Sequence, residues 1–157
     1  MRITLQSAVL CFATLLFSAC NAEPQIPPVQ SDIAPIGRRV ELPQGVIAAR
    51  WIATTANVES GWLEAPDKPL KLYVWLELSQ PHVAHGTAAK TVTLPKAVAT
   101  RLLPDSLLTS AKVQGSELSI DGRAFERLPR ARDPRTTVVV ARWHTGGAWL
   151  ELRVRDE

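Results

Sequence analysis

The stretch TTVVVARWHTGGAWLELRVRDE, residues 136–157, decides the fold class. Two apolar runs flank Gly146-Gly147, and glycine permits the positive φ that a two-residue hairpin turn requires. We therefore predict a β-hairpin centred on these two glycines. Its apolar face holds three facing pairs: Trp143 with Leu150, Ala141 with Leu152, and Val139 with Val154.

The other face of the predicted hairpin is mixed in character. It pairs Arg142 with Glu151, His144 with Trp149, and Val140 with Arg153. A slip of one residue would mix the apolar and polar sets, because side chains alternate between the two faces of a strand. The pattern therefore favours one set of faces strongly.

Earlier segments of the chain resemble the sequence of this hairpin. VIAARW at 46–51 resembles VVVARW at 138–143, and WLEL at 75–78 recurs at 149–152, with GWLEA at 61–65 as a partial third copy. Duplication of a hairpin unit explains the matches, and so does chance recurrence of residues that favour strands. The sequence leaves both explanations open.

Alternation predicts further strands. From residue 70 to 78 every second residue is leucine or valine, with Lys71, Tyr73, Trp75 and Glu77 between them, which is the pattern of a half-buried strand. The remaining predicted strands are 90–94, 117–120 and 123–128, the last two joined by a hairpin turn at Asp121-Gly122.

A helix fits one place, where Pro95 opens PKAVATRLLPD and Pro104 closes it. Several short strands and one short helix predict a mainly β fold, an antiparallel β-sandwich or small barrel. We expect a single domain over residues 40–157, since a chain of this length buries roughly two-thirds of its unfolded surface.

The first 19 residues have the build of an export signal. Met1 and Arg2 precede an uncharged run from Ile3 to Phe17, and the small residues Ser18 and Ala19 follow. The run is shorter than the roughly 20 apolar residues of a membrane-spanning helix and includes polar residues. After it, residues 20–39 carry four prolines without an apolar period, which predicts an extended tether able to reach up to roughly 50 Å.

The segment Leu16-Phe17-Ser18-Ala19-Cys20 resembles the lipobox of bacterial lipoproteins. The resemblance covers about the first 20 residues, and Phe17 stands where leucine is usual. It implies cleavage before Cys20 and attachment of lipid to that cysteine, and Asn21 in the next position favours the outer membrane, on its periplasmic face. An ordinary secretory signal cut after Ala19 or Ala22 is the alternative.

Composition narrows the classes of partner. Cys11 lies within the predicted signal, so Cys20 is the one cysteine left in the mature chain and no disulfide is expected there. The formal net charge of +3 is a mild bias that does not indicate nucleic acid. We expect a membrane contact through the lipid, a periplasmic or outer-membrane protein partner, and no nucleic acid.

Motifs for catalysis are weak. His82 and His85 are the one pair at a metal-ligand spacing, but a catalytic zinc requires three protein ligands. There is no G-x-S-x-G turn and no glycine-rich phosphate loop. Glu59, Glu64 and Asp67 are close in sequence, yet scattered surface acids explain them more simply than a glycosidase pair. We predict a non-enzyme without metal or cofactor.

Tryptophan dominates the aromatic residues. The strand patterns place Trp51 and Trp143 in the core, and they place Tyr73, Trp75 and Trp149 on faces shared with charged residues. Aromatic side chains of the second kind are enriched where proteins meet proteins, and they also stack on sugar rings. Burial beneath a loop, the helix or a second sheet is the other interpretation.

Arginines cluster within thirteen positions, at Arg123, Arg127, Arg130, Arg132 and Arg135. Such a segment is able to contact phosphates or an acidic partner, although most loops of this kind are simply solvated. The predicted partner-binding residues are Tyr73, Trp75, Trp149, His144, Arg130 and Arg132.

These observations predict an outer-membrane lipoprotein whose periplasmic β domain is a protein-interaction module. Such a module would be an accessory subunit of an envelope machine or an inhibitor or immunity-type protein. The second hypothesis is a peptidoglycan- or polysaccharide-binding module that uses exposed Trp75 and Trp149. An uncharacterised hydrolase is the third.

Overall fold

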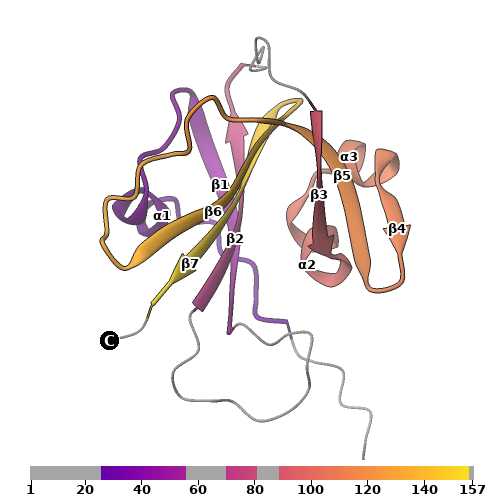
Figure 1. Cartoon of the computed structure of the whole chain (residues 1–157), viewed down its shortest axis with the longest axis horizontal. Coiled ribbons are helices and arrows are strands. Elements are labelled where there is room, and N and C mark those ends of the chain that lie inside the picture. The colour runs from indigo at the N-terminus through magenta and orange to yellow at the C-terminus, as the bar shows by residue number, and fades with distance from the viewer. Residues whose placement is uncertain (1–25, 56–69, 81–88, 156–157) are drawn as a thin grey trace, which may run out of the picture.

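The computed structural model describes residues 26–55, 70–80 and 89–155. Within these ranges, seven antiparallel strands form one sheet, and three short helices pack on it (Figure 1). The strands are β1 (Val46–Thr55), β2 (Leu70–Leu78), β3 (Ala89–Pro95), β4 (Lys112–Gln114), β5 (Glu117–Ala124), β6 (Thr136–His144) and β7 (Gly147–Val154). The helices are α1 (Ala34–Arg39), α2 (Lys96–Leu102) and α3 (Asp105–Ser110).

The mainly β, antiparallel prediction is confirmed. The strand order is β1-β2-β7-β6-β5-β3, with β4 paired to β5, and the sheet is not closed into a barrel. The sheet divides into two parts, β1, β2, β7 and β6 with α1 on one side and β3, β4 and β5 with α2 and α3 on the other (Figure 1). The predicted small barrel is therefore wrong, and one bent sheet takes its place.

The bend lies between β5 and β6. These strands pair only at Arg123 with Trp143 and Ala124 with Arg142, whereas β6 and β7 pair along their whole length. Beyond this short junction the two parts of the sheet face each other, and residues of both parts share one apolar core. A single sheet thus provides the packing that was expected from a sandwich.

The molecule has two apolar cores, one on each face of the four-stranded part. The first, which we call the inner core, joins this part to β3, β5 and α2, with Trp75, Trp149, Leu94, Leu118 and Leu102 among its members. The second, the outer core, lies under α1 and is centred on leucine and valine side chains of β2 and β7. The predicted half-buried strand 70–78 is β2, and residues 72–76 are buried on both faces.

The C-terminal hairpin forms with its predicted faces but a different register. The turn residues are Thr145 and Gly146, with His144 opposite Gly147, because Gly146 takes the positive φ of 80°. All pairs near the turn are therefore displaced by two residues from the prediction. Since side chains alternate with a period of two, this displacement leaves both faces unchanged.

The two repeated segments form equivalent hairpins. β1 pairs with β2 as β6 pairs with β7, and the two hairpins meet where Trp75 lies directly opposite Trp149. The equivalent pairs are Arg50 with Trp75 and Arg142 with Trp149, Ala49 with Leu76 and Ala141 with Leu150, and Val46 with Leu78 and Val138 with Leu152. The repeat is therefore one of structure as well as sequence.

A bulge occurs at the same place in both hairpins. The register shifts between Val46 and Ala48 and again between Val138 and Val140, which leaves Ile47 as the equivalent of Val139. Ile47 and Val139 are exposed, and Val138 is the residue that packs on the outer core. The prediction that Val139 faces Val154 in the apolar face is therefore wrong, because alternation does not reveal a bulge.

The hairpin predicted at Asp121-Gly122 does not form. β5 continues through both residues, and its pairing with β3 places Thr91 opposite Asp121 and Lys90 opposite Gly122. Gly122 is needed for close packing instead of a turn, since a Cβ there would meet the ring of His144 at 2.5 Å. The strand predicted over 123–128 is accordingly absent beyond Ala124 in the described chain.

Helix α2 confirms the predicted helix, but α1 and α3 were not predicted. Pro104, expected as a stop signal, is also the N-cap of α3, and its carbonyl accepts hydrogen bonds from the backbone N–H groups of Leu107 and Leu108. Both helices have only six residues, too few for an apolar period to be recognised.

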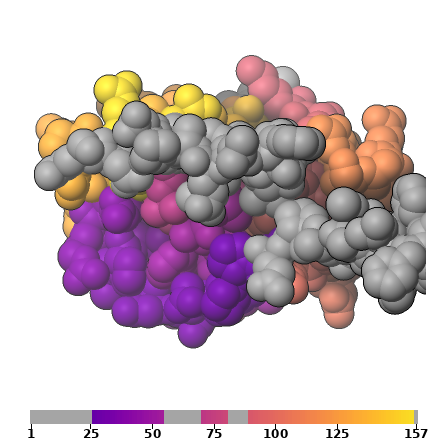
Figure 2. Space-filling view, turned by 90° about the horizontal axis from the view of Figure 1, so that it is seen from below, coloured from indigo at the N-terminus to yellow at the C-terminus, as the bar shows by residue number. Residues whose placement is uncertain are grey.

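Part of the predicted tether belongs to the folded body. Ile36 of α1 and Val40 are fully buried in the outer core, and Gln30 pairs with Trp51 at the edge of β1. In a view from below, the N-terminal part, coloured indigo and purple, lies along one edge, and the yellow and orange C-terminal part lies along the opposite edge (Figure 2). The folded body therefore begins before residue 40.

Candidate functional site

The aromatic residues predicted for partner binding are buried. Tyr73, Trp75 and Trp149 have exposed fractions of 5%, 2% and 0%, and all three belong to the inner core. They do share a face with charged residues, as predicted, but α2, β3 and β5 cover that face. The expectation of an exposed aromatic surface at these positions is therefore wrong, and the interpretation that a second layer covers them is confirmed.

The inner face of the four-stranded part carries a row of two adjacent tryptophans flanked by an arginine at each end. Arg50, Trp75, Trp149 and Arg142 lie side by side in the register of β1, β2, β7 and β6. Arg50 forms an ion pair with Glu77 at 3.6 Å, whereas Nη1 of Arg142 donates to the carbonyl of Ala141 at 2.7 Å. The outer members of the row are thus held in different ways.

Several polar nitrogens of this face are buried. Within the described part of the chain, the buried side-chain nitrogens without a hydrogen-bond partner are Arg50 Nε, Arg142 Nε, His144 Nε2 and Trp149 Nε1. Unsatisfied buried groups are costly, because they lose water without gaining a partner. All four lie at the inner face, which is therefore more polar than its aromatic content suggests.

His144 is a neutral histidine held at the junction of β6 and β5. Burial lowers the pKa of His144 to about 4, the nearby Arg142 charge adds to the lowering, and a hydrogen bond to the backbone of Asp121 opposes it. The ring lies 6.0 Å from the Trp75 ring, measured between centroids, and packs directly on Gly122. Its surroundings suit an uncharged packing residue instead of a partner contact.

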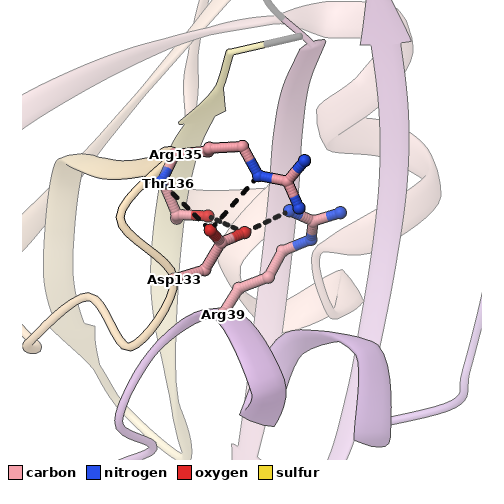
Figure 3. Close-up of polar contacts among 4 residues, drawn as sticks. All are labelled: Arg39, Asp133, Arg135 and Thr136. Atoms are coloured by element: carbon pink, nitrogen blue, oxygen red, sulfur yellow. Dashed lines mark hydrogen bonds and ion pairs between the residues drawn. The ribbon is translucent and has the colours of Figure 1, made fainter. Parts of the chain in front are cut away.

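The predicted arginine segment is ordered by Asp133, which follows Arg132 in the connection between β5 and β6. One carboxylate oxygen of Asp133 accepts from Arg39 Nη1 at 3.1 Å, and the other accepts from the backbone of Arg135 at 3.0 Å (Figure 3). The side chains of Arg135 and Thr136 add two further contacts. The backbone hydrogen bond from Arg135 is the main cause that lowers the pKa of Asp133.

Backbone hydrogen bonds join this connection to α1. The backbone N–H of Glu41 donates to the carbonyl of Arg130, and the N–H of Arg132 donates to the carbonyl of Arg39, both at 2.8 Å. Val40 and Ala131 form an isolated β-bridge between these bonds. The structure therefore brings two distant basic segments together, at residues 37–41 and 130–135.

We call Arg38, Arg39, Arg130, Arg132 and Arg135 the arginine surface. Arg130 and Arg132 were predicted, and both are exposed. Arg38, Arg39 and the organising Asp133 were missed, because no local pattern links α1 to a segment about ninety residues later. The basic last turn of α1 was the available signal, although α1 itself was not recognised.

Other candidates lie outside the described residues. These are Cys20, the pair His82 and His85, the carboxylates Glu59, Glu64 and Asp67, and Trp62 of the third repeat copy. Within the residues that are described, no group of three histidine, cysteine or acidic side chains could hold a metal ion, and no helix is long and apolar enough to cross a membrane.

The predicted core tryptophans are only half-buried. Trp51 and Trp143 pack against the outer core from its margin. Nε1 of Trp51 donates to the carbonyl of Asp32 at 2.8 Å, and Trp143 stacks on Phe125 with ring centroids 3.9 Å apart. Trp75 and Trp149, which the sequence suggested to be exposed, are therefore more deeply buried than Trp51 and Trp143, which it placed in the core.

Comparison with models of protein families, with curated proteins and with solved structures found no match to this chain.

Proposed function

We propose that this protein is a bacterial outer-membrane lipoprotein, anchored through Cys20, whose periplasmic β domain binds another protein. The observation that carries the anchor is the lipobox-like segment Leu16-Phe17-Ser18-Ala19-Cys20 behind an uncharged export signal. The domain acts without catalysis, as an accessory subunit of an envelope machine or as an inhibitor or immunity-type protein.

The length of chain between Cys20 and the folded body limits where the domain works. The carbonyls of Ile26 and Pro27 accept hydrogen bonds from Arg101 of α2, at 3.2 and 3.5 Å, and Ile26 packs against the inner core. Six residue steps separate Cys20 from Ile26, which span at most about 20 Å when fully extended. A lipid at Cys20 would thus keep the domain close to the bilayer, and the reach of roughly 50 Å expected for a longer tether is not available.

The arginine surface supports a binding function. Arg38, Arg130 and Arg132 are exposed, and they are brought together by backbone hydrogen bonds between segments far apart in the sequence. Arginine is enriched in protein interfaces because its guanidinium forms several hydrogen bonds at once. The buried state of Trp75 and Trp149 argues against the alternative of a peptidoglycan- or polysaccharide-binding module built on these rings.

Mass spectrometry of the protein purified from native membranes tests the anchor. We expect a chain that begins at Cys20 and carries the mass of two or three acyl chains, and a Cys20→Ser variant that lacks this mass. An unmodified thiol at Cys20 in the native protein would exclude lipid anchoring.

Crosslinking in intact cells, followed by affinity purification from solubilised envelopes, tests the binding role. One partner protein should be recovered in a stoichiometric amount. The absence of any crosslinked partner, with the domain folded and abundant, would contradict a protein-interaction module.

A further inference from the structure

The two segments that form the arginine surface carry more positive than negative side chains. Five arginines lie in residues 37–41 and 130–135, and the acids in the same two segments are Glu41 and Asp133. The Asp133 side chain is only 16% exposed, and it is already bonded to Arg39 and Arg135. Most of its negative charge is therefore engaged within the surface, so the outward-facing balance is positive.

Three of the five guanidiniums of the arginine surface, those of Arg39, Arg132 and Arg135, are held by hydrogen bonds. Arg39 and Arg135 are fixed on the Asp133 carboxylate (Figure 3). Nη1 of Arg132 donates to the carbonyl of Gly37 at 3.2 Å. Arg132 still presents further N–H groups outward, because a guanidinium has five donors. Pre-positioned donors bind a partner with a smaller loss of side-chain entropy than free ones.

The basic residues of segments 37–41 and 130–135 are all arginines. The lysines of the described chain lie elsewhere, on β2, β3, α2 and β4. A lysine ammonium is a point charge, and a guanidinium offers two parallel N–H groups to one carboxylate. An anionic bilayer attracts both kinds of side chain alike. An all-arginine surface in which Arg39, Arg132 and Arg135 are held in place thus fits discrete carboxylates better than a diffuse lipid charge.

We propose that the arginine surface is the docking site for an acidic patch, rich in aspartate and glutamate, on the partner protein. This inference rests on the proposed protein-binding function and names the chemistry of the partner. Arg38, Arg130 and Arg132 make the outward contacts, and Arg39, Asp133 and Arg135 hold the surface in shape.

A fluorescent peptide of ten aspartates is the probe, titrated into the full protein purified in detergent from native membranes and followed by anisotropy. The test variant combines Arg38→Gln, Arg130→Gln and Arg132→Gln, which leaves the Asp133 contacts intact. The control combines Lys90→Gln, Lys96→Gln and Lys112→Gln, three exposed lysines of β3, α2 and β4, with the same change in charge. We expect the arginine variant to bind roughly 10-fold more weakly or worse, and the lysine control to stay within about twofold.

A third variant, with Arg38→Lys, Arg130→Lys and Arg132→Lys, keeps the charge and removes the paired donors. It should also lose several-fold in affinity, and unchanged binding would overturn the proposal in favour of charge alone. Equal weakening by the arginine and lysine sets would overturn it as well. So would stronger binding of the wild-type protein to phosphatidylglycerol than to phosphatidylcholine vesicles with no binding to the peptide, which would indicate an anionic lipid surface. The peptide readings do not depend on the lipid at Cys20, whose mass is measured separately, and neutral phosphatidylcholine vesicles show how much vesicle binding comes from the lipid alone.

Discussion

Trp75 and Trp149 lie directly opposite each other where the two repeated hairpins meet, and both are almost completely buried. Gly147, two residues before Trp149 and on the same face of β7, lies under the Trp75 ring: a Cβ at this glycine would meet Trp75 Cζ2 at 2.3 Å and the carbonyl oxygen of Leu76 at 2.5 Å. The packing of the central strands β2 and β7 therefore requires a glycine at position 147 as well as the two indole rings.

Gly147→Ala should destabilise the protein by about 1–3 kcal/mol, because neither the Trp75 ring nor the Leu76 backbone is free to retreat. Urea unfolding gives the change in the free energy of unfolding. Gly37→Ala is the matched control, since its Cβ meets only Leu42 Cδ1 at 3.4 Å and the residue lies in α1. An equal loss in both variants would show that the contact with Trp75 is not the cause.

Trp75→Ala should lower the free energy of unfolding by about 3–5 kcal/mol, since it empties a large volume in the inner core. Ile47→Ala in the β1 bulge should change it by less than about 0.5 kcal/mol, because Ile47 is 65% exposed. Urea unfolding followed by tryptophan fluorescence and circular dichroism checks both. A Trp75→Ala protein of wild-type stability would contradict burial of this ring and reopen a binding role for it.

Stability should fall on acidification through His144. Its pKa is lowered to about 4 in the fold against 6.5 when free, so the unfolded chain binds a proton first as the pH falls. The loss should begin near pH 6.5, grow to roughly 3 kcal/mol near pH 4 and then stop increasing. Urea unfolding at several pH values should show this pH-dependent loss in the free energy of unfolding in the wild type and not in His144→Leu. Parallel pH profiles for the two proteins would disprove it.

Asp133→Ala should loosen the connection between β5 and β6, because Arg39, Arg135 and Thr136 lose their common acceptor. Limited digestion with trypsin, read by mass spectrometry, should then cut sooner after Arg130 and Arg132. Asp105→Ala at the start of α3 removes the same charge far from this connection and should leave the cleavage rate unchanged. Unaltered cleavage in Asp133→Ala would show that the carboxylate does not hold the connection.

The protection that Asp133 gives to the connection between β5 and β6 should not change with pH over the range in which His144 titrates. The pKa of Asp133 lies below its ordinary 3.8, so its contacts persist above that pH and are lost only as the pH falls through the lowered value. Trypsin cannot report there, but hydrogen exchange of the 130–136 amides can, and it should stay slow from pH 7 to pH 4.5 after correction for intrinsic rates. Loss of protection near pH 6 would assign the connection to the His144 transition instead.

Local sequence predicted whatever depends on alternation. The strands from 70 to 78 and from 136 to 154 and the apolar face of the C-terminal hairpin follow from the order of apolar and polar residues, and the helix after Pro95 follows from the two prolines that bound it. The turn lies one residue earlier than predicted, at Thr145-Gly146, which shifts the strand pairing by two residues and therefore keeps the faces. The bulges at Ile47 and Val139 left no mark in the pattern.

The tertiary structure decided which face of the sheet is covered by other elements and which charged residues come into contact. Alternation showed that Tyr73, Trp75 and Trp149 share a face with charged residues, but only the bend between β5 and β6 brings α2 and β3 over that face and buries them. In the same way, the contact of Arg39 with Asp133 spans two segments that no local rule connects. Side-chain periodicity is a property of one strand, whereas burial and charge pairing depend on where the rest of the chain returns.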